Sequence, residues 1–357
     1  MFSKNKNNEN NTCLISALDW GLGHTTRLFP VIRDAVKNGY NVIIACNSTQ
    51  KKVFLEEFPD LRYEEIKGYD ISYGKSGFFT FLKLLLQIPK ILTRINFEKK
   101  WVARFLSGNK VDLIISDNRY GFRNKKVYSV FITHQLAPKS GIGKSSDRFM
   151  QFFLYQYINK FNECNVPDNE NENILAGDLS HPLVKPKVIV KYIGALSRLK
   201  DIPQEWHSDP VPDKYILCIL SGPEPQRSIL ENIILKDINN SPLPVIIVRG
   251  KPIEKNSQKG NTENIRFFSH LKGGELAYLI NNAGIIISRS GYSTLMDLAV
   301  LNKNSITIPT PGQTEQEYLA WFHKEKYGRI YFKQEEFSFK VIQNLLKEQG
   351  VGVNKLK

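Results

Sequence analysis

Cysteine is scarce in this chain: its 357 residues contain only four. No two of them form a CxxC pair, and no HxxxH or histidine–carboxylate ligand spacing occurs. Zinc sites and redox couples need such patterns, so we predict no tightly held metal and no bound cofactor. Cys13, Cys46 and Cys218 lie in apolar, strand-like runs. Buried free thiols are typical of a reducing compartment, so we expect a cytoplasmic protein.

Long apolar runs are also lacking. No stretch of about 18 uncharged apolar residues is present, so no membrane-spanning helix is expected. The first residues, MFSKNKNNENN, contain no apolar segment that could act as a signal peptide. We therefore expect residues 1–11 to form a flexible polar tail.

Several familiar site motifs are missing as well. The loop SGPEPQR at 221–227 contains neither GxGxxG nor GK[ST], which argues against a dinucleotide site and a P-loop. No GxSxG motif occurs, so a hydrolase triad is unsupported.

Acidic residues are outnumbered by basic ones. The chain has 49 Lys and Arg and 35 Asp and Glu, a formal charge of 49 − 35 = +14. This excess favours an anionic partner such as a nucleotide, a nucleic acid or an acidic membrane surface, although a solvated basic surface would explain it equally well. No nucleic-acid recognition motif or stacking platform is present, so we do not expect a nucleic-acid partner.

Apolar strand patterns and amphipathic helix patterns alternate along the chain. In the first half, strands are predicted at 12–19, 40–47, 111–118 and 126–135, with helices at 25–39 and 48–58. This alternation predicts βαβ units and a parallel sheet.

The pattern restarts after a proline-containing, helix-poor stretch at 178–213. Strands are predicted at 214–221, 244–250, 284–290 and 304–310, and helices at 226–238, 273–282, 292–301 and 314–327. We therefore predict two Rossmann-like α/β domains, 12–188 and 189–334. A final segment, 335–357, begins with a helix that could pack on either domain.

Ligands of such sheets bind beyond the carboxyl ends of the strands, where loops lead into helices. Six loops at these positions hold most of the polar and glycine residues: GLGH, SDN, THQ, SGPEPQR, SRSG and PGQTEQ. If the two domains face each other, all six can line one cleft.

The segment SRSGYSTLMDLA predicts an anion site. Ser290 and Gly291 precede a helix, whose unpaired N–H groups and positive dipole end would bind a pyrophosphate. Asp297, six residues beyond Gly291, could accept hydrogen bonds from the two hydroxyls of a ribose. The alternative is an ordinary serine-capped helix with a surface aspartate.

Two further loops of the second half carry candidate residues. Gln313, Gln316 and Glu317 crowd the start of the helix at 314–327 and are suited to reading sugar hydroxyls. The alternative is acidic compensation of the helix dipole. Gly222 allows close approach of the backbone to a phosphate, although 221–227 could equally be a plain proline-rich turn.

The first half offers a candidate base. Gly21, Gly23 and His24 end its first strand, and His24 could accept a proton near neutral pH or simply cap a helix. Asp117, at the end of another strand, is a second candidate base. His134 and Gln135 follow a third strand and are candidates for contacting an acceptor.

The segment 75–104 has seven basic residues, one acid and interleaved aromatic residues. This composition suits a helix lying on an anionic bilayer surface. It suits even better a core helix with a charged outer face.

These motifs together resemble those of the GT-B glycosyltransferases, and in particular glycosyltransferase family 28. GLGH, THQLAP and YIGALSR are similar to family motifs in the N-terminal and linking regions. SGPEPQR, FFSHL and TEQEY lie where the family contacts its donor. The strongest resemblance is SRSGYSTLMDLA, in which Asp297 replaces a ribose-binding glutamate.

The resemblance implies a GT-B fold, two domains facing a cleft, and an inverting transfer from a nucleotide sugar that is usually UDP-linked. It places Arg198 at the donor phosphates, His270 in a segment that reads uracil, and Gln316 and Glu317 by the sugar. The expected donor-binding residues are Arg198, Gly222, Glu224, Arg227, His270, Ser290, Gly291, Ser293, Thr294, Asp297, Gln313, Gln316 and Glu317.

We therefore expect a hexosyltransferase, with His24 or Asp117 as the base and Gly21, Gly23, His134 and Gln135 on the acceptor side. The acceptor is unknown, and a lipid or membrane-linked glycan at the inner face of the cell membrane would fit segment 75–104. The alternatives are a UDP-N-acetylglucosamine 2-epimerase and a non-catalytic protein that binds nucleotide sugars or acidic lipids.

Overall fold

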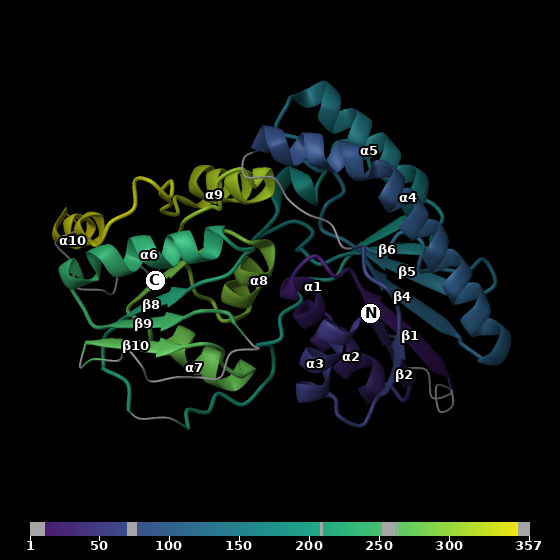
Figure 1. The fold of residues 1–357 in the computed structure, drawn as a ribbon, viewed down its shortest axis with the longest axis horizontal. Coiled ribbons are helices and arrows are strands. Elements are labelled where there is room, and N and C mark those ends of the chain that lie inside the picture. The colour runs from purple at the N-terminus through teal and green to yellow at the C-terminus, as the bar shows by residue number, and fades with distance from the viewer. Residues whose placement is uncertain (1–10, 70–76, 208–209, 252–261, 263, 349–357) are drawn as a thin grey trace. The chain divides into compact units, whose positions relative to one another are not determined.

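A computed structural model describes residues 11–69, 77–207, 210–251, 262 and 264–348. The chain divides into two compact units, Met1–Arg198 and Leu199–Lys357. Each unit is built on its own parallel sheet, as the ribbon in Figure 1 shows. The prediction of two parallel α/β domains is therefore confirmed.

The first unit contains a seven-stranded sheet in the order β3-β2-β1-β4-β5-β6-β7, with every neighbouring pair parallel. Because all strands run the same way, the loops that follow them gather at one edge of the sheet. The strands are β1 Thr12–Ala17, β2 Asn41–Cys46, β3 Arg62–Glu65, β4 Leu113–Asp117, β5 Tyr128–Ile132, β6 Glu163–Val166 and β7 Ile189–Tyr192.

Helices cover both faces of this sheet. On one face, α1 Leu22–Arg27, α2 Phe29–Lys37 and α3 Ser48–Glu57 bury Leu28, Ile32 and Phe54 against β1 and β2. On the other face lie α4 Gly77–Gly108 and α5 Lys144–Ile158. Burial on both faces explains why the strands read as continuous apolar runs.

The described side chains of α4 begin at residue 87. Ile95 and Val102 are buried, and Phe97, Trp101 and Phe105 pack around the core. This half of the helix therefore matches the interpretation of segment 75–104 as a core helix. Residues 75–76 and the side chains of 77–86 lie outside what the structure describes. No helix in the described part of the chain has the length and apolar character to cross a bilayer.

The second unit contains a five-stranded parallel sheet in the order β10-β9-β8-β11-β12. One face packs against α6 and α10, the other against α7 and α8. The elements are β8 Ile216–Ile219, α6 Gln226–Asp237, β9 Val245–Val248, β10 Ile265–Phe268, α7 Gly273–Asn282, β11 Ile285–Ser288, α8 Tyr292–Val300, β12 Ile306–Thr307, α9 Thr314–Tyr327 and α10 Phe339–Glu348. Two short 3₁₀ turns, Gly177–Leu179 and Ile238–Asn240, complete the chain.

The structure refines the sequence prediction at several places. The helix expected at 25–39 is two helices, because Pro30 lies in the first turn of α2, where a missing N–H is tolerated. The first unit ends after Arg198 and not after residue 188, because β7 pairs with β6. The final helix packs on the second unit, where Phe339 and Ile342 are fully buried.

Because each unit has its own core, a cavity in one core should destabilise that unit. Ile247 of β9 is fully buried, and we expect Ile247→Ala to lower the unfolding free energy of the second unit by about 2–5 kcal/mol. Hydrogen exchange should show faster exchange in β8, β9 and β11 and unchanged protection in β1, β2 and β4. Equal loss of protection in both sheets would contradict two separate cores.

Candidate functional site

In the first unit, His24 and Asp117 lie side by side at the carboxyl edge of the sheet. Asp117 is the last residue of β4, and the turn after β1 brings His24 of α1 beside it. Nδ1 of His24 lies 2.8 Å from Oδ1 of Asp117. An ionised carboxylate only accepts hydrogen bonds, so Nδ1 carries the proton and Nε2 keeps a lone pair. The side chain of Asp117 is fully buried, whereas that of His24 is 18 % exposed.

Arg27 completes this cluster and was not anticipated from the sequence. It lies one helical turn after His24, is 2 % exposed, and donates from Nε and Nη2 to the two oxygens of Asp117. Nδ1 of the buried His134 lies 3.3 Å from Nη1 of Arg27. Since a guanidinium only donates, Nδ1 of His134 is the acceptor. Three of the residues predicted from separate strands, His24, Asp117 and His134, are thus brought together.

The electrostatics of the cluster assign different states to the two candidate bases. Burial alone would raise the pKa of Asp117, but Arg27 and His24 outweigh it and hold this pKa below its ordinary value. Burial, helped by the charge of Arg27, lowers the pKa of His24 below 6.5, although Asp117 acts in the opposite direction. At neutral pH the pair is therefore a carboxylate beside a neutral imidazole.

A second buried ion pair joins helix α4 to the carboxyl edge of the sheet. Arg119, two residues after Asp117, donates to Glu98 of α4 at 2.7 Å, and both side chains are almost fully buried. Arg119 also donates to the carbonyl oxygens of Ala17 and Lys67. Arg119 therefore ties the end of β1 and the segment after β4 to helix α4.

The remaining residues predicted for the acceptor side lie on the same loops. Gly21 precedes α1 with φ +89°, a conformation that favours glycine. Gly23 is inside α1, and Gln135 is half-buried beside His134.

In the second unit, the start of α8 has the features of an anion site. The helix begins after Gly291, and no side chain in the described residues caps it. Ser290 is fully buried, and its hydroxyl donates to the carbonyl oxygen of Gln316 at 2.7 Å. The alternative interpretation of a serine-capped helix is therefore excluded for Ser290. The N–H groups of the first turn of α8 have no partner within the helix.

Gly291 is not required by the local backbone. Its φ of −67° is available to any residue, and a Cβ placed there would have Nε2 of Gln316, 3.9 Å away, as its nearest neighbour. A glycine with room for a side chain is consistent with close approach by a ligand. Ser293 and Thr294 lie four and three residues before Asp297, so all three are on one side of α8 and are half-buried, while its other face enters the core.

Three loops meet beside this helix start because β8, β11 and β12 are neighbours. Oε1 of Gln316 accepts a hydrogen bond from the backbone of Thr310, and its Nε2 donates to Gln313 at 2.5 Å. Glu317 accepts from the backbone of Gly312 at 2.9 Å. The three polar residues predicted to read sugar hydroxyls therefore also hold the loop in which they lie.

The start of α6 is different, since a carboxylate of the protein already occupies it. Glu224 accepts a hydrogen bond from the backbone of Ser228 and is paired with the buried Arg227, which also binds Glu231. The adjacent Gly222 has φ +100°, and a Cβ there would lie 3.7 Å from Oγ1 of Thr310. Arg227 thus lies within an ion network of α6.

Two predicted donor residues, His270 and Arg198, lie outside the loops that follow β8, β11 and β12. His270 follows β10, the edge strand of the second sheet, and is half-buried. Arg198 is the last residue of the first unit, where its carbonyl oxygen accepts a hydrogen bond from Arg33.

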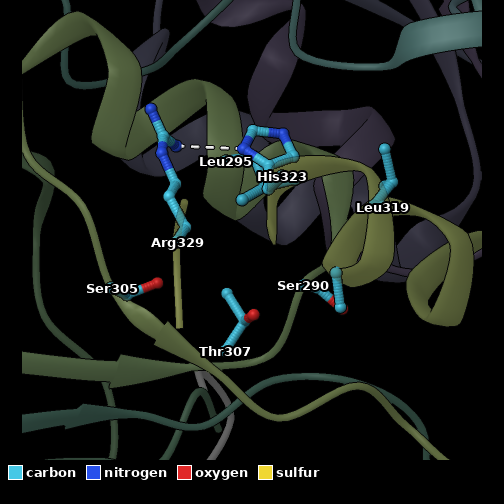
Figure 2. A pocket seen from close by; sticks show the side chains of 8 residues that line it. Ser290, Leu295, Ser305, Thr307, Leu319, His323 and Arg329 are labelled. Carbon is cyan, nitrogen blue, oxygen red and sulfur yellow. Dashed lines mark hydrogen bonds between the residues drawn. The ribbon is translucent and has the colours of Figure 1, made fainter. Parts of the chain in front are cut away.

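A small pocket lies beneath Ser290, as Figure 2 shows. Its volume is about 10 Å³, roughly the least space that can hold one water molecule. In Figure 2 the side chains of His323 and Arg329 point toward each other, and their Nδ1 and Nη1 atoms are 3.0 Å apart. The lining residues are Ser290, Leu295, Ser305, Thr307, Leu319, Ala320, His323 and Arg329. The pocket is too small for a nucleotide.

Metal ligands do not gather in the described ranges: no group of three or more His, Cys, Asp or Glu side chains there is placed to hold an ion.

Comparison with solved structures defines the class of this fold. A spinosyn rhamnosyltransferase superposes with a TM-score of 0.63 at 13 % identity over 95 % of this chain and 92 % of that one. The glycotransferase of kitacinnamycin gives 0.62 at 12 % over 97 % and 93 %, and MurG of Acinetobacter baumannii gives 0.55 at 12 % over 96 % and 91 %. The chain has the GT-B fold.

Sequence comparison then finds a family match within the second unit. The Glycosyltransferase family 28 C-terminal domain matches residues 226–350. An uncharacterized glycosyltransferase of Methanosarcina acetivorans is 19 % identical over 92 % of this chain and 88 % of its own length, and one of Methanosarcina mazei is 20 % identical with the same coverage. The resemblance to family 28 is confirmed, and these comparisons support a glycosyltransferase.

The lowered pKa of His24 can be measured directly. In histidine NMR spectra of the full chain, assigned with His24→Gln, we expect His24 to titrate with a midpoint below 6.5. Asp117→Asn should move this midpoint further down, because the carboxylate favours the charged imidazole. Since the folded state takes up this proton less readily than the unfolded chain, stability should fall as the pH drops below 6.5. A midpoint above 6.5 would show that Asp117 outweighs burial and Arg27.

Proposed function

We propose that this protein transfers a hexose or N-acetylhexosamine from a UDP-linked sugar to an acceptor hydroxyl, with inversion at the anomeric carbon. The observation that carries the proposal is the start of α8, where an uncapped helix end and an adjacent glycine precede a stripe of polar side chains ending in Asp297.

The donor half of the proposal follows from simple electrostatics. The first N–H groups of α8 and the positive end of its dipole stabilise a diphosphate. Asp297 then accepts hydrogen bonds from the ribose hydroxyls, and Gln313, Gln316 and Glu317 provide amide and carboxylate groups for the sugar. Arg198 is proposed to add positive charge at the phosphates, and His270 lies in the segment proposed to contact uracil.

On the acceptor side, the geometry favours His24 over Asp117 as the base. Asp117 is fully buried, and both of its oxygens accept from Arg27. His24 is partly exposed, and its Nε2 is left with a lone pair. We assign His24 as the proton acceptor and Asp117 as the group that fixes its tautomer and orientation.

In the proposed reaction, the acceptor oxygen attacks the anomeric carbon on the face opposite the diphosphate. The new C–O bond forms, the bond from the anomeric carbon to the phosphate oxygen breaks, and Nε2 of His24 takes the hydroxyl proton. The charge that develops on the leaving diphosphate is stabilised at the start of α8.

The ribose assignment predicts a selective loss of affinity. Calorimetry with UDP should show binding weakened about tenfold or more by Asp297→Ala, since hydrogen bonds to a charged acceptor are lost. Inorganic pyrophosphate lacks the ribose and is the matched control, so its affinity should not change. Unaltered UDP affinity in the variant would refute the assignment.

Two further measurements separate sugar transfer from epimerisation. Mass spectrometry of donors incubated with acceptors detects transfer, and NMR of UDP-N-acetylglucosamine incubated alone detects epimerisation.

A surface of the first unit supports the proposal of membrane contact. On α5, Phe149 and Phe152 are 64 % and 61 % exposed, and Phe153 is also exposed. Oη of Tyr155 donates to the carbonyl oxygen of Val184, so α5 lies beside the exposed Leu183 and Val184. The same two segments carry the exposed basic residues Lys144, Arg148, Lys185 and Lys187.

Exposed apolar and basic side chains on the same segments suit an anionic bilayer, where aromatic groups enter the interface and the charges meet lipid headgroups. Such a surface would bring the enzyme to a lipid or membrane-linked acceptor.

The triple substitution Phe149→Ser, Phe152→Ser and Phe153→Ser tests this contact. At low salt the wild type should float with phosphatidylserine-containing vesicles and not with neutral ones, and the triple variant should remain in solution. Trp321→Ser removes a similarly exposed aromatic residue from the second unit and should float like the wild type. Absence of wild-type flotation would rule out the membrane proposal without affecting the donor assignment.

A further inference from the structure

Arg289 is a buried cation without a counter-charge. Arg289 follows Ser288, the last residue of β11, and precedes Ser290 and the start of α8. Its side chain is completely buried. Its guanidinium donates only to neutral oxygens: the carbonyls of Ile308, Pro309 and Gln226, and Oε1 of Gln334. Among the residues that the structure describes, no carboxylate is paired with it, and its Nε atom has no hydrogen-bond partner.

The other deeply buried arginines of the described chain are neutralised. Arg27 is paired with Asp117, Arg119 with Glu98, and Arg227 with Glu224 and Glu231. A buried charge without a counter-charge costs free energy. Burial therefore lowers the pKa of Arg289 from its ordinary value to about 10. At neutral pH the residue is therefore still charged, so the second unit keeps an uncompensated positive charge in its interior.

The position of this charge is informative. Its four acceptors come from the loop after β12, the first residue of α6 and the segment after α9. Arg289 therefore links the loops that surround the uncapped start of α8. Both lie at the same end of β11, and among the described residues the helix start has no side-chain cap and the guanidinium has no carboxylate partner.

We propose that Arg289 is a positioning residue whose charge is balanced by the diphosphate of the donor. It does not touch the ligand: it fixes the loops around the start of α8 and adds a full positive charge behind them. A charge in a poorly solvated interior acts on a nearby anion more strongly than a solvated one, because screening by water is reduced. The inference rests on the proposed donor site and adds a specific source of its affinity for phosphates.

A purely structural role makes a different prediction. If Arg289 only held the loops, its loss would weaken every ligand of the site to a similar extent. If its charge acts on the diphosphate, the loss should grow with the number of phosphate charges and be absent for the nucleoside alone.

The experiment compares uridine, UDP and inorganic pyrophosphate binding to the full chain by calorimetry. For Arg289→Gln we expect about tenfold weaker binding of UDP and pyrophosphate, and less than about a twofold change for uridine. Arg266→Gln is the matched control. It removes the same charge from β10 of the same sheet, two strands away from β8, where Arg266 donates to the carbonyl of Pro210. We expect its three affinities to match those of the wild type.

Arg289→Lys keeps the inference testable if the glutamine variant does not fold. At about pH 7 it should retain much of the affinity for pyrophosphate, and at about pH 9 it should lose it, because a buried lysine gives up its proton more readily than arginine. The wild type should change little over this range. A lysine variant that follows the wild type at both pH values would overturn the charge argument.

Three further outcomes would overturn the inference: equal losses for uridine and UDP, no loss for UDP, or no binding of pyrophosphate to the wild type. The proposed function fails in a distinguishable way. If the wild type binds pyrophosphate but neither UDP nor other nucleoside diphosphates, the donor class is wrong, and the pyrophosphate comparison alone still decides the role of Arg289.

Discussion

The proposed donor site depends on the hydrogen bonds that the first turn of α8 cannot make within the helix. Every α-helix begins with N–H groups that lack an internal partner, and most proteins supply a side-chain cap. Here Gly291 stands at the capping position and has no side chain, and the hydroxyl of the preceding Ser290 donates to the carbonyl of Gln316. The helix end is left available, next to a glycine that no backbone strain requires. An anion is the ligand that such an arrangement favours most.

In the second unit, buried polar side chains hold the loops beside this helix start. The amide of Gln316 shapes the loop after β12, and Arg289 joins that loop to the start of α6. By contrast, α6 already has the carboxylate of Glu224 at its start. The first unit is organised differently: a carboxylate, an arginine and two histidines are packed where β1, β4 and β5 end. One unit thus presents positive charge, and the other a neutral imidazole that can take up a proton.

The sequence predicted the parts of the molecule that are determined locally. Long apolar strands and the strand–loop–helix pattern around SRSG identified the fold class and the start of α8, because glycine, serine and Asp297 act within a few residues of one another. It did not predict β3, β6, β7 and β10, each only four residues long and partly polar or flanked by polar residues. It also missed Arg27 and Arg119, whose partners lie 90 and 21 positions away. Long-range pairing of this kind has no signal in one sequence.

A crystal structure of the protein soaked with UDP would test the central claim most directly. The account predicts phosphate oxygens within hydrogen-bond distance of the backbone N–H groups at the start of α8, and the ribose hydroxyls at the carboxylate of Asp297. Density for UDP at any other place, such as the start of α6, or crystals that take up no nucleotide at saturating concentration, would contradict it.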